Sequence, residues 1–179
     1  MVAIKLATIA AYKLALIEDF ILLLGIRAEP RLREMNVFAR NLDRQTGLFA
    51  DNPTPISRSI LESVLEGIRL LRERNHHGEY CAIVAPDLYQ RAFQPRTNAM
   101  DAPIYEIRPL LREGGFQYSP AAPEGTGVIF SLGGSTVDLA VLVDMMAELT
   151  DEENGIVFLR TVEQFRQRIN DPTAIVALT

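Results

Sequence analysis

The chain has 179 residues, 48% of them hydrophobic, and carries a formal net charge of −5 at pH 7. This length suits one large domain or two small lobes, and the apolar content is sufficient for a sizeable core. The acidic balance and the scattered Lys and Arg residues disfavour a nucleic-acid-binding surface, which needs clustered positive charge.

The first predicted element is a helix over residues 3–24. Its apolar residues recur at helical spacing and form two strips, which predicts a helix packed on two sides. The main strip consists of Ala3, Leu6, Ala7, Ala10, Leu14, Ile17, Ile21 and Leu24. Lys5, Lys13 and Glu18 interrupt the segment too often for a membrane-spanning helix or a signal peptide. We therefore expect a buried spine helix that ends at Gly25.

A loop is predicted over residues 47–55, where two prolines prevent regular hydrogen bonding. A second helix follows, for which Thr54 is the predicted N-cap and Pro55 lies in the first turn. Its predicted buried stripe comprises Ile60, Leu61, Val64, Leu65, Ile68 and Leu71. The basic residues at 72 and 74 suit the last turn of this helix, because the helix dipole favours positive charge there.

The middle of the chain combines one strand with short helices. The uninterrupted apolar run over 80–85 predicts a strand covered on both faces. Short helices are expected over 88–93 and over 104–112, the second shortened or kinked by Pro109. A polar loop over 94–103 connects them.

Strand patterns dominate the remainder of the chain. We expect strands over 116–119, 128–131, 137–143, 157–160 and 165–169. Residues 151–155 are predicted to form a hairpin tip with Asn154-Gly155 as the turn pair. Because helices and one buried strand come first and mostly antiparallel strands last, the order predicts an α+β fold in two lobes.

The sequence offers few groups for catalysis, cofactor binding or metal binding, and we predict none of these. The only histidines, His76 and His77, are neighbours whose side chains diverge, so they do not form a metal site. The single cysteine, Cys81, fits a reducing, cytoplasmic compartment and lies in an apolar run, which favours an inert core thiol. A cysteine-dependent enzyme that pairs Cys81 with one of the histidines stays open as a minor hypothesis. Adjacent residues Glu18 and Asp19 point about 100° apart on a helix and do not form a catalytic dyad.

Five segments carry short motifs in a fixed order: 13–25, 78–84, 114–120, 127–134 and 161–174. The segment 78–84 (Gly-Glu-Tyr-Cys-Ala-Ile-Val) resembles the Gly-Pro-Tyr-x-Leu-Val motif of the encapsulins, the bacterial and archaeal nanocompartment shell proteins. The first, third, fourth and fifth segments are similar to that family's Glu-Asp helix, its Gly-Gly-strand-Pro segment, its Val-Val-x-Ser-x-Arg-Gly-Gly motif and its closing Thr-Glu-x-Phe pattern. The resemblance covers the C-terminal two-thirds of the family pattern. Leu132 stands where the family has arginine, and Ser135 stands where it has aspartate.

The resemblance implies the fold of tailed-phage major capsid proteins: a long spine helix, a mixed axial lobe and a C-terminal antiparallel sheet. In that arrangement residues 1–35 form the spine of a peripheral lobe, residues 36–133 form the axial lobe, and residues 134–179 supply strands that complete the peripheral lobe. It also implies a pore loop near a five-fold axis, made of Arg96, Thr97, Asn98, Ala99, Met100 and Asp101.

The function implied by the resemblance is that of a non-enzymatic shell protein that self-associates into an encapsulin-like nanocompartment or a phage-like capsid. Its partners would be copies of itself in an icosahedral shell, an enclosed cargo protein, or a separate polypeptide that supplies the N-terminal arm and extended loop which precede the spine helix in the family. No membrane or nucleic-acid partner is expected, and the expected location is the cytoplasm, or the virion for a phage-derived chain. The alternative is a truncated interaction module that forms no cage.

Overall fold

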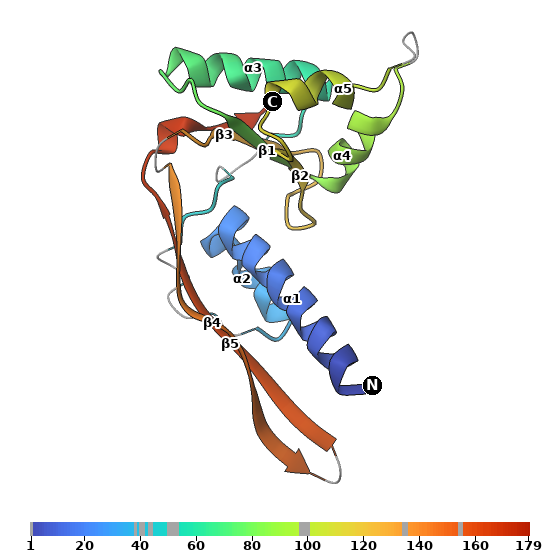
Figure 1. Cartoon of the computed structure of the whole chain (residues 1–179), viewed down its shortest axis with the longest axis vertical. Helices are drawn as coiled ribbons and strands as arrows, with labels where there is room; N and C mark the ends of the chain where they lie inside the picture. The colour runs from blue at the N-terminus through green and yellow to red at the C-terminus, as the bar shows by residue number, and fades with distance from the viewer. Residues whose placement is uncertain are drawn as a thin grey trace.

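The structure is a computed structural model, and it describes residues 2–37, 39, 42, 45–49, 54–96, 101–133, 136–153 and 156–179. Figure 1 shows short helices over a four-stranded sheet, a long helix α1 below that sheet, and a long two-stranded hairpin beside the helix. The expected α+β fold is confirmed.

Helix α1 (Val2–Leu24) has the bounds that the apolar periodicity predicts, and it ends at Gly25. Gly25 has φ +58°, and a Cβ atom there would lie 2.5 Å from the carbonyl oxygen of Gln45. The passing segment donates backbone hydrogen bonds to the helix end, from Leu48 N to Leu22 O (3.1 Å) and from Phe49 N to Leu23 O (3.0 Å). A glycine is therefore required for this close crossing.

The C-terminal half of α1 is packed on two sides, as expected for a spine. One side meets the four-stranded sheet in an apolar cluster that contains Leu23 and Val128. The other side meets a cluster that contains Ile21, Leu32 and Phe165. The N-terminal half differs from the expectation of burial, because Ile9 is 53% exposed there and Tyr12 is 68% exposed. Short segments η1 (Ile26–Ala28) and α2 (Glu29–Glu34) follow α1.

The N-cap of helix α3 (Ile60–Glu73) is Ser59, so the predicted cap at Thr54 is wrong. Glu62 N donates to Ser59 Oγ (3.3 Å) and Ser59 N donates to Glu62 Oε2 (3.1 Å). This reciprocal capping box satisfies two backbone donors that Thr54 could not reach. The predicted buried stripe is correct except at Leu65, which is 46% exposed.

The four-stranded sheet has the order β2-β1-β3-β6. Strands β1 (Tyr80–Val84), β2 (Phe116–Tyr118) and β3 (Gly127–Ser131) match predicted strands. Strand β6 (Ile175–Leu178) was not predicted; it pairs antiparallel with β3, so the last residues complete this sheet. The division into lobes at residues 35 and 133 stays a prediction.

Helices α4 (Pro86–Phe93) and α5 (Ile104–Ile107) lie beside α3 on the same side of the sheet (Figure 1). The segment continues as the 3₁₀ turn η3 (Arg108–Leu110). The helix predicted over 104–112 is therefore short, as expected because Pro109 has no backbone N–H to donate. The largest apolar cluster fills the space between these helices and the sheet.

The hairpin consists of β4 (Val137–Glu153) and β5 (Ile156–Ile169), with Glu153 paired to Ile156. The predicted turn pair Asn154-Gly155 lies outside the described residues. The two separate strands predicted over 157–160 and 165–169 are one continuous strand, and β4 is longer than predicted. Register shifts within β4, between Val141 and Met146, explain why a strict alternation of apolar residues did not reveal its length.

Gly67 sets the distance between α3 and the sheet, because a Cβ atom there would lie 2.6 Å from Ile129 Cγ2. We expect Gly67→Ala to destabilise the fold by about 1 kcal/mol, since overpacking costs about 1–3 kcal/mol and the gain in helix propensity offsets at most about 1 kcal/mol of it. Urea unfolding measures the change. Leu65→Ala, on the exposed side of the same helix, is the control and should shift stability by less than about 0.5 kcal/mol. An alanine variant as stable as the wild type contradicts this packing.

Candidate functional site: surfaces for subunit association

The predicted pore loop lies between α4 and α5. Of its six residues, Thr97, Asn98, Ala99 and Met100 lie outside the described residues. Arg96 forms an ion pair with Glu106 of α5, and Asp101 is exposed directly before the buried Ala102. The loop is therefore anchored to the helical layer at both ends, and its position near a symmetry axis stays a prediction.

The residues of the cysteine-enzyme hypothesis are not brought together among the described contacts. His76 Nε2 lies 2.9 Å from Thr173 Oγ1 and 3.6 Å from Asp171 Oδ2, so its ring is engaged by the segment before β6. Burial raises the pKa of the Cys81 thiol, which lowers the fraction of reactive thiolate. In the ranges that the structure describes, no group of three or more His, Cys, Asp or Glu is placed to hold a metal ion.

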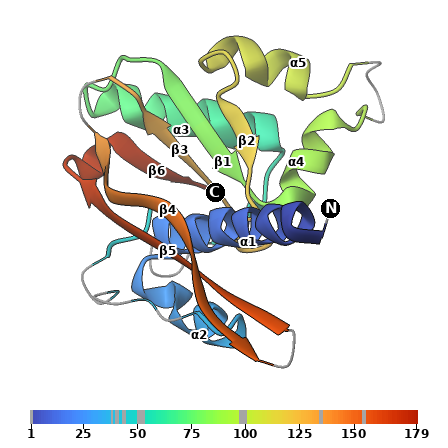
Figure 2. The same ribbon diagram turned by 60° about the horizontal axis from the view of Figure 1, so that its bottom comes forward.

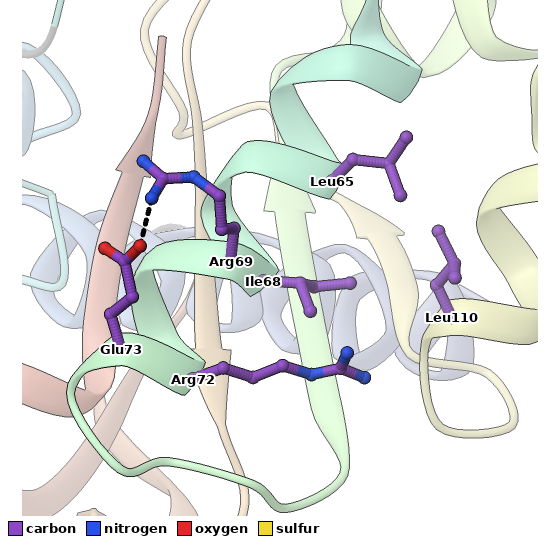
Figure 3. A pocket seen from close by; sticks show the side chains of 6 residues that line it. All are labelled: Leu65, Ile68, Arg69, Arg72, Glu73 and Leu110. Carbon is purple, nitrogen blue, oxygen red and sulfur yellow. Dashed lines mark hydrogen bonds and ion pairs between the residues drawn. The ribbon is translucent and has the colours of Figure 1, made fainter.

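A shallow, open hollow of about 400 Å³ lies on the outer surface of α3. Figure 3 shows Leu65, Ile68 and Leu110 directed toward it, with Arg72 at its edge. Arg69 forms ion pairs with two glutamates of the same helix, so its charge is already paired and is not directed into the hollow. These side chains supply apolar contact area and one guanidinium, but no nucleophile paired with a base.

Among the residues whose burial the structure describes, the largest group of exposed apolar side chains on one element lies on the β4–β5 hairpin. We call the following residues the hairpin apolar set; they are 45–66% exposed: Leu139, Val141, Leu142, Met145, Met146 and Phe158. Exposed apolar groups gathered on one element mark contact surfaces, because water contact with each of them is unfavourable. The hairpin is thus the principal candidate surface for association.

The hairpin also exposes its backbone. Within the described residues, β4 and β5 pair only with each other, so the outer edge of each strand lacks a partner strand. A two-stranded ribbon is marginally stable alone, and free edges are sites where a further chain can pair. Figures 1 and 2 show that the hairpin extends away from the four-stranded sheet and passes α1 and α2.

Polar contacts between the two strands close the base of the hairpin. Asn170 N donates to Thr136 O (2.9 Å), and Arg168 Nη2 donates to Asp138 Oδ2 (2.8 Å) across the two strands. This ion pair lowers the pKa of the Asp138 carboxyl. Further along, Phe165 packs into the apolar cluster with α1.

One acidic side chain of the hairpin has a buried oxygen. Glu163 Oε2 on β5 is buried and has no hydrogen-bond partner among the described residues. Burial, followed by the neighbouring charges of Glu18 and Asp144, raises the pKa of Glu163 to about 7. Sequence analysis missed this group because its acidic neighbours lie on other elements, and Glu163 is not unusual locally.

None of the helices that the structure describes has the length and apolar character needed to span a bilayer.

The fold is shared with a particle-forming protein. The chain described as "Crystal structure of virus-like particle from Pyrococcus furiosus" matches with a TM-score of 0.59 and 18% identity, over 82% of this chain and 62% of that one. A chain described as Mycobacterium phage Che8 matches with a TM-score of 0.49 and 12% identity, over 72% of this chain and 52% of that one. The Pyrococcus match defines the class: an α+β chain with the fold of a virus-like-particle subunit.

The family follows from the sequence. The family model described as "Encapsulating protein for peroxidase" (Linocin_M18) matches residues 1–166, and the chain belongs to this family, the encapsulins. The "Type 1 encapsulin shell protein EncA" of Myxococcus xanthus (strain DK1622) is 31% identical over 117 residues, which are 65% of this chain and 40% of that protein. The resemblance inferred from the motifs is confirmed. The chain spans 40% of the length of the Myxococcus relative and 62% of the Pyrococcus chain.

The burial of Cys81 makes its reactivity a direct test of the cysteine hypothesis. We expect the native thiol to react several-fold more slowly with a disulfide reagent at pH 7.5 than the thiol of the urea-unfolded chain, because burial raises its pKa. His76→Ala should leave the native rate unchanged, since the ring is bound to Thr173. If the native thiol reacts rapidly with the reagent, and its reaction rate falls in the His76→Ala variant, the result would instead support an activated cysteine.

Proposed function

We propose that this chain is a non-enzymatic subunit of an encapsulin-like shell and that it associates with copies of itself through the β4–β5 hairpin. The observation that carries the proposal is the hairpin apolar set on a ribbon with two unpaired edges. Membership of the encapsulin family supports it. Such a surface is unfavourable in water and becomes favourable when a neighbouring subunit covers it.

The proposal extends to the arrangement of the subunit within a shell. Residues 1–35 and 134–179 would form the peripheral lobe and residues 36–133 the axial lobe, with β6 returning to pair with β3. The loop over 96–101 would then line an opening at a symmetry axis. Stable obligate interfaces bury about 2,000 Å² or more, so contacts along the hairpin must be combined with others.

The proposed partners follow from the family and from the exposed hairpin. The family description names a peroxidase, which supports an enclosed cargo protein. A separate polypeptide that pairs with the free edges of the hairpin is the other proposed partner. The proposed location is the cytoplasm.

A second function also fits the exposed apolar side chains and free strand edges of the hairpin. A free-standing interaction module that forms no cage, and uses the hairpin to bind one partner, accounts for the same exposed surface.

Replacing hairpin apolar residues with a charged one tests the proposed surface. We expect Leu142→Asp and Phe158→Asp each to weaken self-association at least about tenfold, since burying an unpaired carboxylate in an apolar contact costs more than about 1.4 kcal/mol. Ile26→Asp is the matched control, because Ile26 is also an exposed apolar residue, 48% accessible, but lies off the hairpin. Mass photometry and negative-stain microscopy measure particle size, and thermal unfolding checks that each variant is folded.

The unmodified chain decides between the two functions. Particles far larger than the 20.0 kDa monomer support the shell. A monomer or dimer at every concentration rejects self-assembly and leaves the interaction module. Hairpin variants that assemble like the wild type would show that another surface forms the shell.

A further inference from the structure

The middle of the β4–β5 hairpin exposes two adjacent methionines. Met145 is 45% exposed and Met146 is 47% exposed, and both belong to the hairpin apolar set. The strand pairing places them between Leu139, which lies near the base of the hairpin, and Phe158, which lies toward its tip. Two thioether side chains therefore occupy the centre of the surface that is proposed for association.

The strand pairing is irregular at this point. The register shifts between Val143 and Met146, so that Asp144 and Met145 together lie opposite one residue of β5. The backbone N–H of Met145 donates to Asp144 Oδ1 (2.8 Å), the carboxylate of its own neighbour. Such a bulge redirects side chains locally, and the hairpin has no third strand among the described residues. Both methionine side chains are consequently open to water.

The other methionines of the chain have different surroundings. The sequence contains five, of which Met1 and Met100 lie outside the described residues. Met35 follows α2, where its N–H donates to Arg31 O (3.1 Å), and it is half-buried. Among the methionines that the structure describes, the two on the hairpin are thus the most accessible to a reagent in solution.

An exposed thioether reacts with peroxides. The sulfur lone pair attacks one oxygen of hydrogen peroxide, so an S–O bond forms as the O–O bond breaks. The departing hydroxide takes the proton of the transferred OH group and leaves as water. In this two-electron step methionine is oxidised to its sulfoxide and the peroxide is reduced. The product is a polar side chain with a strong hydrogen-bond acceptor in place of a soft, apolar one.

We propose that Met145 and Met146 form an oxidation site, and that their conversion to sulfoxides by a peroxide weakens association through the hairpin. The oxidation site is a property of the single chain. Its consequence for association rests on the proposed function.

The effect on association follows from the position of the two side chains. A neighbouring subunit that covers the hairpin apolar set also covers these methionines. A sulfoxide buried there without a hydrogen-bond donor is strongly disfavoured, whereas a thioether is apolar and adapts to the shape of a partner. Association in turn shields both sulfur atoms from peroxide. Oxidation and association therefore oppose each other, and a subunit oxidised beforehand is disfavoured as a component of the shell.

Peroxide treatment of the dilute, unassembled chain tests the oxidation site. Peptide mass mapping after timed exposure to hydrogen peroxide measures the oxidation of each methionine, and of Cys81, separately. We expect sulfoxide to form at Met145 and Met146 at least about twofold faster than at Met35, in line with their greater exposure. Oxidation of Met35 at an equal or higher rate overturns the site.

Mass photometry of treated and untreated protein tests the consequence for association. We expect oxidation to weaken self-association of the wild type at least about fivefold, because a polar group is then buried without a partner. The double variant Met145→Leu with Met146→Leu should associate normally and resist peroxide, since leucine has a similar volume and no sulfur. Met35→Leu is the matched control and should respond to peroxide as the wild type does.

Two further measurements complete the experiment. Thermal unfolding checks that the oxidised chain is folded, and reduction of the sulfoxides by methionine sulfoxide reductases of both epimer specificities should restore association. Unchanged association of the oxidised wild type, or an equal loss in the double leucine variant, overturns the proposal. A chain that stays monomeric before any treatment rejects the proposed function instead, and the oxidation rates still decide the site.

Discussion

The structure depends on the packing of the C-terminal half of α1 between two apolar clusters. Phe20 and Leu24 belong to both clusters, one shared with the four-stranded sheet and the other with α2 and the hairpin. Asp19 adds a hydrogen bond from Ser119 Oγ (2.5 Å), which ties the helix to the connection between β2 and β3. Since the sheet and the hairpin touch the same helix, α1 determines where the hairpin lies relative to the sheet.

Sequence patterns correctly predicted those helices and strands whose formation depends on residues close together in the chain. The bounds of α1 follow from helical periodicity and the glycine at its end, and β1 follows from a short apolar run. The capping box at Ser59 and Glu62 was visible as Ser-x-x-Glu, but the prolines before it suggested an earlier start. Strand β6 was missed because its four apolar residues form a strand only through pairing with β3, which the sequence does not show.

The candidate surfaces were harder to predict because exposure is a tertiary property. Leu65 lies on the apolar stripe of α3 yet is 46% exposed, and Tyr12 is 68% exposed on a helix that looked buried throughout. Asp19 was considered with its neighbour Glu18, whereas in the fold it accepts a hydrogen bond from the hydroxyl of Ser119, a residue distant in sequence. The family could be inferred from the order of short motifs along the chain, because that order is visible in the sequence. Individual tertiary contacts are not visible there.

The exposed apolar groups are distributed unevenly over the molecule, and this distribution is itself informative. The sheet and its helices enclose a complete core, in which residues such as Val64, Ala82 and Ile129 are inaccessible. The N-terminal half of α1 and the far part of the hairpin both extend away from that core (Figure 1). Folding of the single chain therefore buries a core at one end of the molecule, whereas apolar side chains of α1 and the hairpin, such as Tyr12 and Leu142, stay in contact with water at the other end. Side chains exposed in this way favour contact with a further polypeptide surface.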